Sequence, residues 1–203
     1  APAAKILLVG TAAEYGMPDP SNIKLSEKYR CNPVSSYGIS KHAMVLAGLD
    51  YWRKYQMKIV VARPFNIVGA GVPFQLVVGS FLERIKKVSR DEKVGVIRVG
   101  NVNNRRDFVA IEDALEAFIR LVDGEHWGEI VNVCTGHSVE IRTIFETILS
   151  QSNINCTLEV DPALVGISDI PIVCGSPEKA KRLISFSPSP MLDNAVHAAW
   201  SHV

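Results

Sequence analysis

Hydrophobic residues along the chain form two alternating patterns, short continuous runs and longer stretches with helical spacing. The first run, at 5–10, is almost wholly apolar and ends in a glycine, which predicts a strand buried on both faces of a parallel sheet. Similar runs predict strands at 57–62, 94–99 and 129–134. The remaining stretches predict helices at 33–56, 74–88, 108–122, 141–149 and 192–199, with a further helix starting near 176–178. Strands that alternate with helices predict an α/β fold with a mainly parallel sheet.

The helix predicted at 108–122 has the clearest periodicity. Its apolar residues recur with gaps of three and four positions, at Phe108, Ile111, Leu115, Phe118 and Val122. Asp107 comes directly before this stretch and Gly124 soon after it. We therefore predict Asp107 as the N-cap of the helix and Gly124 as the residue past its end.

Charge and composition exclude several function classes. Lysine plus arginine number 22 and aspartate plus glutamate 21, so the formal net charge of +1 argues against nucleic acid or an anionic membrane as a partner. The 203 residues, 47% of them hydrophobic, suit one large domain or one domain and part of a second. The apolar runs are far too short to span a bilayer, and no signal-peptide pattern is visible, so we expect a cytoplasmic protein.

The cysteines and histidines do not predict a metal site. The cysteines lack the paired spacing of metal ligands and the density of a disulfide framework, and are expected to be buried or half-buried thiols: Cys31, Cys134, Cys156 and Cys174. The five histidines form no pair on one helix face, so no zinc site is expected.

Candidate chemistry begins with Tyr37 and Lys41, which are four residues apart and therefore on one face of a predicted helix. An ammonium beside a phenol favours the phenolate, so such a tyrosine can exchange a proton near neutral pH. Alone, this spacing fits an ordinary surface pair equally well. Thr11 adds context, because it directly follows the first predicted strand, where α/β sheets bind their ligands.

Three motifs together resemble a known family. Thr11, Tyr37 and Lys41 resemble the catalytic Ser/Thr–Tyr–Lys set of the short-chain dehydrogenase/reductase superfamily. The segment 63–71, Arg-Pro-Phe-Asn-Ile-Val-Gly-Ala-Gly, resembles the extended branch, the NAD-dependent epimerase/dehydratase family, which handles nucleotide-sugars. The segment 99–108, with its Gly-Asn and Arg-Arg-Asp-Phe, resembles the members that act on GDP-linked sugars.

The resemblance implies the C-terminal part of a Rossmann-like doubly wound parallel sheet plus a smaller α/β substrate-binding domain. Residues 1–70 are expected to belong to the dinucleotide-binding domain and to carry the catalytic residues. Residues 71–203 are expected to form mainly the nucleotide-sugar-binding domain, with some segments returning to the Rossmann sheet. The glycine-rich dinucleotide-binding motif does not occur in the sequence. We therefore expect roughly 100 residues of the cofactor-binding half to be missing upstream of residue 1.

The resemblance also implies roles for single residues. Tyr37 would protonate the ketone oxygen at C4 of the sugar while hydride arrives from the nicotinamide of NADP or NAD. Lys41 would hold the nicotinamide ribose, Thr11 would donate a hydrogen bond to the same ketone oxygen, and Pro64 would contact the cofactor. The chemistry needs a positioned acid because hydride addition creates an alkoxide.

A larger set is expected to bind the nucleotide-sugar: Thr11, Ala12, Asn66, Val77, Phe81, Arg106, Ser168 and Asp169. A turn role for Asn66 and a helix-core role for Val77 and Phe81 remain equally open. Arg106, placed directly before the predicted N-cap, suits a diphosphate because its guanidinium is planar and bidentate. Gly166 stands where similar reductases have an arginine against the diphosphate. This departure either weakens the assignment to GDP-sugars or leaves Arg105 and Arg106 to bind the phosphates.

The reaction implied is NAD(P)H-dependent reduction of the C4 ketone of GDP-4-keto-6-deoxymannose to GDP-D-rhamnose. Two alternatives stay open, a nucleotide-sugar 4-epimerase of the same family and a non-catalytic nucleotide-sugar-binding fragment that lacks the cofactor site. A dehydratase is disfavoured, since Ala12 and Ala13 stand where related 4,6-dehydratases carry an acid.

A homodimer is the expected assembly, since family members commonly dimerise through the tyrosine-bearing helix. The helix predicted at 33–56 has apolar residues on more than one face: Met44, Leu46, Leu49, Tyr51 and Trp52. This pattern fits burial against a partner and burial within one subunit.

Overall fold

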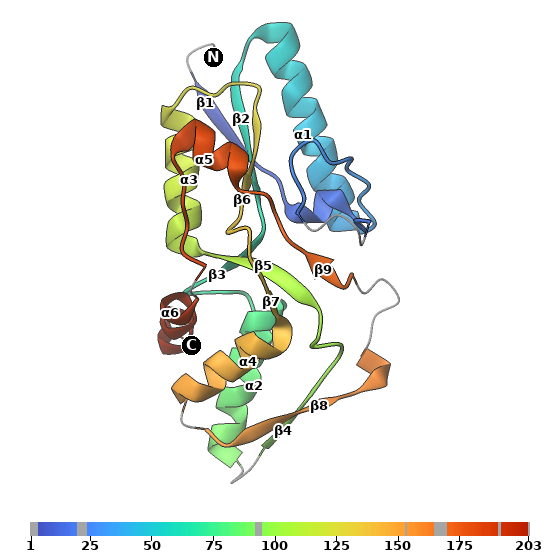
Figure 1. Cartoon of the computed structure of the whole chain (residues 1–203), viewed down its shortest axis with the longest axis vertical. Coiled ribbons are helices and arrows are strands. Elements are labelled where there is room, and N and C mark those ends of the chain that lie inside the picture. Colours follow the sequence, from blue (N-terminus) through green and yellow to red (C-terminus); the bar gives the residue numbers. More distant parts are fainter. Residues whose placement is uncertain are drawn as a thin grey trace.

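The computed structural model describes residues 4–19, 24–91, 95–152, 154–164, 170–190 and 192–202. Its upper part in Figure 1 is built on three parallel strands in the order β1 (Lys5–Val9), β2 (Lys58–Pro64) and β6 (Ile130–Val133). Helix α1 (Ser36–Tyr55) lies on one side of this sheet, and α3 (Ile111–Asp123) and α5 (Glu178–Ile184) lie on the other.

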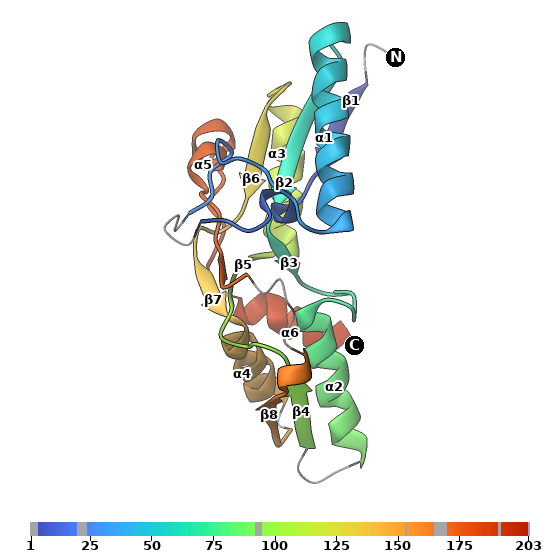
Figure 2. The same cartoon turned by 90° about the vertical axis from the view of Figure 1, so that its right-hand side faces the viewer.

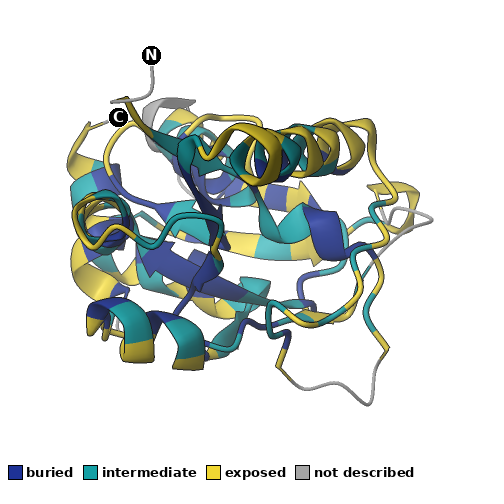
Figure 3. Ribbon diagram, turned by 90° about the horizontal axis from the view of Figure 1, so that it is seen from above, coloured by how far each residue is buried: buried dark blue, intermediate teal, exposed yellow. Residues whose placement is uncertain are grey.

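Strand β2 has a core on both of its faces. Val60 and Ala62 pack in a cluster with Ala114, Ala117 and Leu121 of α3, whereas Val61 packs with Val45 and Leu49 of α1. Side chains of a strand alternate between its two faces, so a continuous apolar run is what two covering helix layers require. In Figure 3 the buried residues accordingly lie towards the centre and the helices expose their outer faces.

The lower part has its own core. Strands β4 (Gly95–Val99) and β8 (Cys156–Val160) pair in parallel, and three helices pack with them: α2 (Val77–Asp91), α4 (Ile141–Ser152) and α6 (Asp193–His202). The rings of Phe81 and Phe145 meet edge to face with centroids 5.5 Å apart, which joins α2 to α4.

A small mixed sheet lies between the two parts (Figures 1 and 2). Its central strand β5 (Arg105–Ala110) pairs in parallel with β3 (Asn66–Val68) and β9 (Ile172–Val173), and antiparallel with β7 (Ser138–Glu140). Two single-turn 3-10 helices complete the described elements, η1 (Ala12–Tyr15) and η2 (Pro162–Leu164).

The predicted fold class is confirmed, because the chain is a mixed α/β structure with parallel sheets. The strands β3, β5, β7, β8 and β9 were not predicted. Strands β3, β7 and β9 have only two or three residues and β5 begins with charged residues, whereas β8 alternates apolar and polar residues, a strand signal that was overlooked. All four cysteines are free thiols, with Cys31 half-buried and the others buried, as predicted. The division into domains at residue 70 stays a prediction.

The predicted N-cap role of Asp107 is wrong. Helix α3 begins at Ile111 after Ala110, which makes no side-chain cap, and Asp107 lies inside β5. Its buried carboxylate accepts hydrogen bonds from the backbone N–H groups of Thr135, Gly136 and Gly175 and from the Thr135 hydroxyl. Burial raises the pKa of Asp107, and these donors oppose that effect. Asp107 therefore ties β5 to the segments after β6 and β9.

The described helices include none whose length and apolar character would allow it to cross a membrane.

Candidate active site

A cavity of about 550 Å³ opens at the carboxyl ends of β1 and β2, beside the first turn of α1 and the start of α2. Parallel strands of α/β sheets bind ligands at this edge. The predicted site residues that line the cavity are Thr11, Ala12, Tyr37, Pro64, Asn66, Val77 and Arg106.

Thr11 is held in place by its own turn. It is the N-cap of η1, and its Oγ1 accepts a hydrogen bond from the backbone N–H of Ala13 at 3.3 Å. Its backbone N–H donates to Glu14 Oε1 at 2.9 Å, which completes a capping box. Gly16 has φ 69°, and a Cβ there would lie 1.7 Å from the carbonyl oxygen of Asn32, so the turn requires glycine.

Tyr37 and Lys41 lie on the first two turns of α1. The Tyr37 side chain is 56% exposed and faces the cavity, and Lys41 Nζ lies 5.9 Å from the centre of its ring. Lys41 Nζ also donates to the carbonyl oxygen of Val9 at 2.9 Å, which anchors it to the end of β1.

Gly38 brings α1 close to η1. A Cβ at this position would lie 2.7 Å from the carbonyl oxygen of Ala13, so only glycine permits the approach without a backbone shift. Ser35 caps the helix by accepting from the Gly38 N–H at 3.1 Å. Thr11 and Tyr37 thereby reach the same cavity from two elements.

Asn66 and Arg106 line the other wall. Asn66 Nδ2 donates to the carbonyl oxygen of Asp107 at 2.9 Å. Arg106 Nη1 donates to the carbonyl oxygens of Ile170 at 2.7 Å and Arg105 at 2.9 Å. The prediction that Arg106 stands before a helix cap is wrong, because it lies inside β5; it reaches the cavity from that strand.

Other predicted residues lie elsewhere. Phe81 is 2% exposed and belongs to the lower core, where it borders a smaller hollow of about 240 Å³ together with Val77 and Arg84. Ser168, Asp169 and Gly166 lie outside the described residues.

Sequence reasoning missed a buried charge network behind the cavity. Glu14 is fully buried and Arg63 is 1% exposed; Arg63 Nη2 donates to Glu14 Oε2 at 2.8 Å. His42 Nδ1 lies 3.2 Å from the same oxygen, and the Arg63 guanidinium lies 4.8 Å from the Tyr15 ring centre. The Thr-x-x-Glu spacing at Thr11 was the signal that could have found Glu14, since it is the pattern of a capping box.

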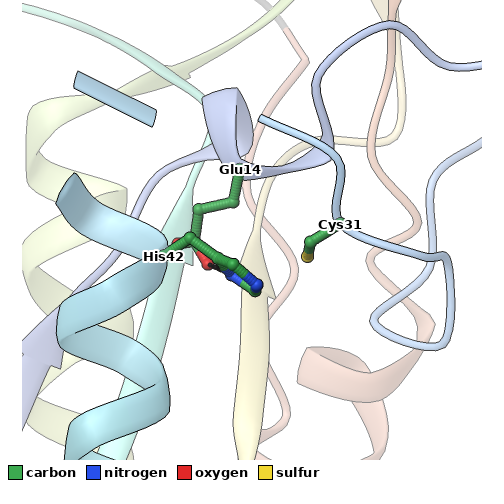
Figure 4. Close-up of side chains that lie close together, drawn as sticks. All are labelled: Glu14, Cys31 and His42. Carbon is green, nitrogen blue, oxygen red and sulfur yellow. Dashed lines mark hydrogen bonds and ion pairs between the residues drawn. The ribbon is translucent and has the colours of Figure 1, made fainter. Parts of the chain in front are cut away.

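Figure 4 shows Glu14 and His42 meeting, with Cys31 pointing towards them from a neighbouring loop. One potential metal-ligand atom from each of the three side chains lies within 4.8 Å of the other two, a spacing that would allow them to coordinate a metal ion. However, Arg63 already donates to the Glu14 oxygen, and its positive charge opposes a cation there. Burial also raises the pKa of the Cys31 thiol, which disfavours the thiolate that metals bind. The contacts therefore favour an ion-pair network.

These features define a Rossmann-like α/β protein whose cavity lies at the carboxyl ends of parallel strands. Residues 1–134 match the model of the NAD dependent epimerase/dehydratase family, so the chain belongs to this family.

Its similarity to particular proteins is lower. The chain is 25% identical to the GDP-6-deoxy-D-mannose reductase of Pseudomonas aeruginosa, over 96% of this chain and 64% of that protein. It is 29% identical to the GDP-6-deoxy-D-talose 4-dehydrogenase of Aggregatibacter actinomycetemcomitans, over 86% of this chain and 56% of that protein. The solved structure of RMD from Pseudomonas aeruginosa, complexed with NADPH, shares the fold with a TM-score of 0.89 at 22% identity, over 98% of this chain and 66% of that one. The chain thus spans less than two thirds of the length of these relatives.

Proposed function

We propose that this chain carries the catalytic and sugar-binding part of an NAD(P)H-dependent nucleotide-sugar reductase. The proposed reaction is reduction of the C4 ketone of GDP-4-keto-6-deoxymannose to GDP-D-rhamnose, in the cytoplasm and by a homodimer. The observation that carries this proposal is the convergence of Thr11 and Tyr37 on one cavity, with Lys41 next to the Tyr37 ring.

The surroundings of Lys41 fit a dinucleotide. Its ammonium has three donors and gives one to the carbonyl oxygen of Val9, so two can meet the hydroxyls of a nicotinamide ribose. The adjoining wall of Val9, Pro64 and Phe65 is apolar, as the face of a nicotinamide ring requires. When bound, the reduced cofactor supplies the hydride.

The residues of this chain would complete the reduction. Thr11 donates a hydrogen bond to the ketone oxygen, and Tyr37 transfers its phenolic proton to that oxygen as C4 gains hydride, so the alcohol forms without a free alkoxide. Lys41 stabilises the phenolate left on Tyr37. Because Tyr37 is half-exposed, water can return its proton.

Asn66 and Arg106 are proposed to hold the sugar-diphosphate. Arg106 is fixed by two carbonyl oxygens, which orients its guanidinium towards the cavity wall at low entropic cost. A planar guanidinium can form two parallel hydrogen bonds to a phosphate group, as a diphosphate would require.

The substitution Tyr37→Phe tests the proposal in the full-length protein, with GDP-4-keto-6-deoxymannose and either NADPH or NADH. Loss of the phenolic proton should lower kcat by about 10²- to 10⁴-fold with the fold unchanged. Cofactor oxidation and the sugar product are followed together. Tyr55→Phe, at the exposed other end of α1, is the matched control and should keep the wild-type rate.

Three outcomes separate the alternatives. A wild-type rate in Tyr37→Phe would refute the assigned role of this residue. Turnover of a nucleotide-sugar without net cofactor oxidation would indicate the 4-epimerase, which uses the same acid–base residues. Binding without turnover by the full-length wild-type protein would indicate the non-catalytic alternative.

A dehydratase remains disfavoured, because Ala12 and Ala13 both line the cavity and offer no acid.

A further inference from the structure

The carboxylate of Glu14 contacts three segments: the turn after β1, which carries Thr11; helix α1, which carries Tyr37 and Lys41; and strand β2. Oε1 accepts from the backbone N–H of Thr11 at 2.9 Å, directly after β1. Oε2 accepts from Arg63 of β2 at 2.8 Å and lies 3.2 Å from Nδ1 of His42, the neighbour of Lys41 on α1. Figure 4 shows the Glu14 side chain running from η1 to the His42 ring.

The surroundings are shaped for a charged carboxylate. Glu14 is fully buried, and a carboxylate without water is costly unless a cation and hydrogen-bond donors compensate it. Arg63, buried to 1% exposure, provides the cation. A Cβ at Gly10 would lie 2.3 Å from Glu14 Oε1, so glycine at this position leaves the space that the carboxylate occupies.

The contacts within the turn that carries Thr11 and Glu14 determine which hydrogen bond Thr11 can offer. The Thr11 N–H is bound to Glu14, and the Thr11 Oγ1 accepts from Ala13 N–H. A hydroxyl that accepts from its own turn keeps its proton for another acceptor. Thr11 lines the cavity, so that proton is available to a ligand there.

We propose that Glu14 is a positioning residue of this site. Its carboxylate locks the Thr11 turn to β2 and to the Lys41 turn of α1, and thereby holds the Thr11 hydroxyl as a donor to the substrate carbonyl. This inference rests on the proposed function, and it gives the Arg63–Glu14–His42 network a task beyond stability.

The substitution Glu14→Gln provides the test in the full-length protein. The Thr11 N–H and Arg63 bind different oxygens of Glu14, and glutamine replaces one of these oxygens with an NH₂ donor, so it cannot accept both hydrogen bonds in this geometry. We expect kcat to fall about 10- to 100-fold, because a small displacement of a catalytic group is enough for such a loss. KM for the nucleotide-sugar should stay within about two-fold, since the Thr11 hydrogen bond matters most in the transition state.

A double-mutant cycle with Thr11→Val distinguishes positioning from general stability. If Glu14 acts through Thr11, Glu14→Gln should cost less than about two-fold in kcat once the Thr11 hydroxyl is absent. Equal costs in the two backgrounds would overturn the proposal. Glu83→Gln, at a partly exposed glutamate paired with Lys87 on α2, is the control and should change neither kcat nor KM.

Hydrogen exchange gives a readout that does not need activity. The segment 10–16 should exchange faster in Glu14→Gln than in the wild type, and unchanged exchange would overturn the role of Glu14 whatever the rates. If the wild type does not reduce the ketone, the proposed function fails; faster exchange in Glu14→Gln would then still show that Glu14 holds the Thr11 turn.

The substitution His42→Asn, at a half-buried position, serves if Glu14→Gln does not fold. It should lower kcat about two- to five-fold when Thr11 is present and have no such effect in the Thr11→Val background. An equal loss without Thr11 would refute the proposal.

Discussion

Among the single residues behind the cavity, Tyr15 has a clearly altered proton equilibrium. It is 1% exposed, its hydroxyl donates to Asn132 Oδ1 at 2.8 Å, and its ring lies beside the Arg63 guanidinium. Burial raises the pKa of Tyr15 to about 12, from 10.0 for an exposed phenol, although the positive charge of Arg63 acts in the opposite direction. The neutral phenol is therefore the form that the fold selects.

This pKa predicts a loss of stability in alkali. Because the folded value lies above the unfolded value, the contribution of Tyr15 is fully present below pH 10 and is lost as the pH rises from 10 to 12. The loss should be about 3 kcal/mol, measured as the free energy of unfolding in denaturant at a series of pH values. Tyr15→Phe should show a flatter dependence on pH over this range, whereas Tyr55→Phe, at an exposed position, should keep the wild-type slope. If the stability of Tyr15→Phe fell between pH 10 and 12 as steeply as that of the wild type, Tyr15 would not be the group responsible.

At the scale of elements, α1 contributes both to the site and to the outer surface. Its inner face packs Val45 and Leu49 against Val61 of β2. Its outer face exposes Ile39 and Leu46, each 54% exposed and seven residues apart, which places them on one side of the helix. Met44 and Trp52 are partly buried within the subunit, so they contribute less to this outer face than the sequence pattern implied.

The outer face of α1 predicts how the proposed homodimer can be broken. Leu46→Glu would place a charge in the middle of the apolar face, and burial of an unpaired charge is strongly unfavourable. We expect the molar mass from light scattering to fall from that of a dimer to that of a monomer. Ile119→Glu introduces the same charge at a 62% exposed position of α3 and should leave the dimer intact. A monomeric wild type, or a Leu46→Glu variant that stays dimeric, would count against this interface.

At the scale of the whole molecule, the cavity lies where the upper and lower parts meet. Thr11 and Pro64 reach it from the upper sheet, Arg106 from the central strand β5, and Val77 from α2 of the lower part. A ligand that fills this cavity therefore contacts the upper part, the small mixed sheet and the lower part. Since the net charge is only +1, the attraction for the proposed diphosphate would have to come from placed groups such as Arg106.

This arrangement predicts that GDP stabilises the whole fold through Arg106. At about 100 times its dissociation constant, GDP should add about 2.7 kcal/mol and raise the Tm of the full-length protein by about 5–10 °C. Arg106→Ala removes a charge-assisted contact, so the same GDP concentration should give less than about half of that shift in a thermal melt. Arg98→Ala, at an exposed arginine paired with Glu159, is the control and should retain it. An undiminished shift in Arg106→Ala would exclude Arg106 from diphosphate binding.

The sequence by itself determined the features that depend on local geometry. Apolar runs and helical spacing predicted the main strands and helices, because each period reflects the backbone of a single element. The shared helix face of Tyr37 and Lys41 followed from their separation of four residues, and the position of Thr11 followed from the end of its strand.

Only the tertiary structure decided the features made by distant segments. Asp107 looked like a helix cap, but its buried partners include Thr135 and Gly175, which no local pattern connects to it. Glu14 and Arg63 are 49 residues apart and meet only because η1 covers the end of β2. Phe81 had a helical spacing that suited both a binding site and a core, and only the structure shows it packed against Phe145; its role in binding stays a prediction. The physical reason is that burial and ion pairing depend on the neighbours that folding brings together, which a one-dimensional pattern does not contain.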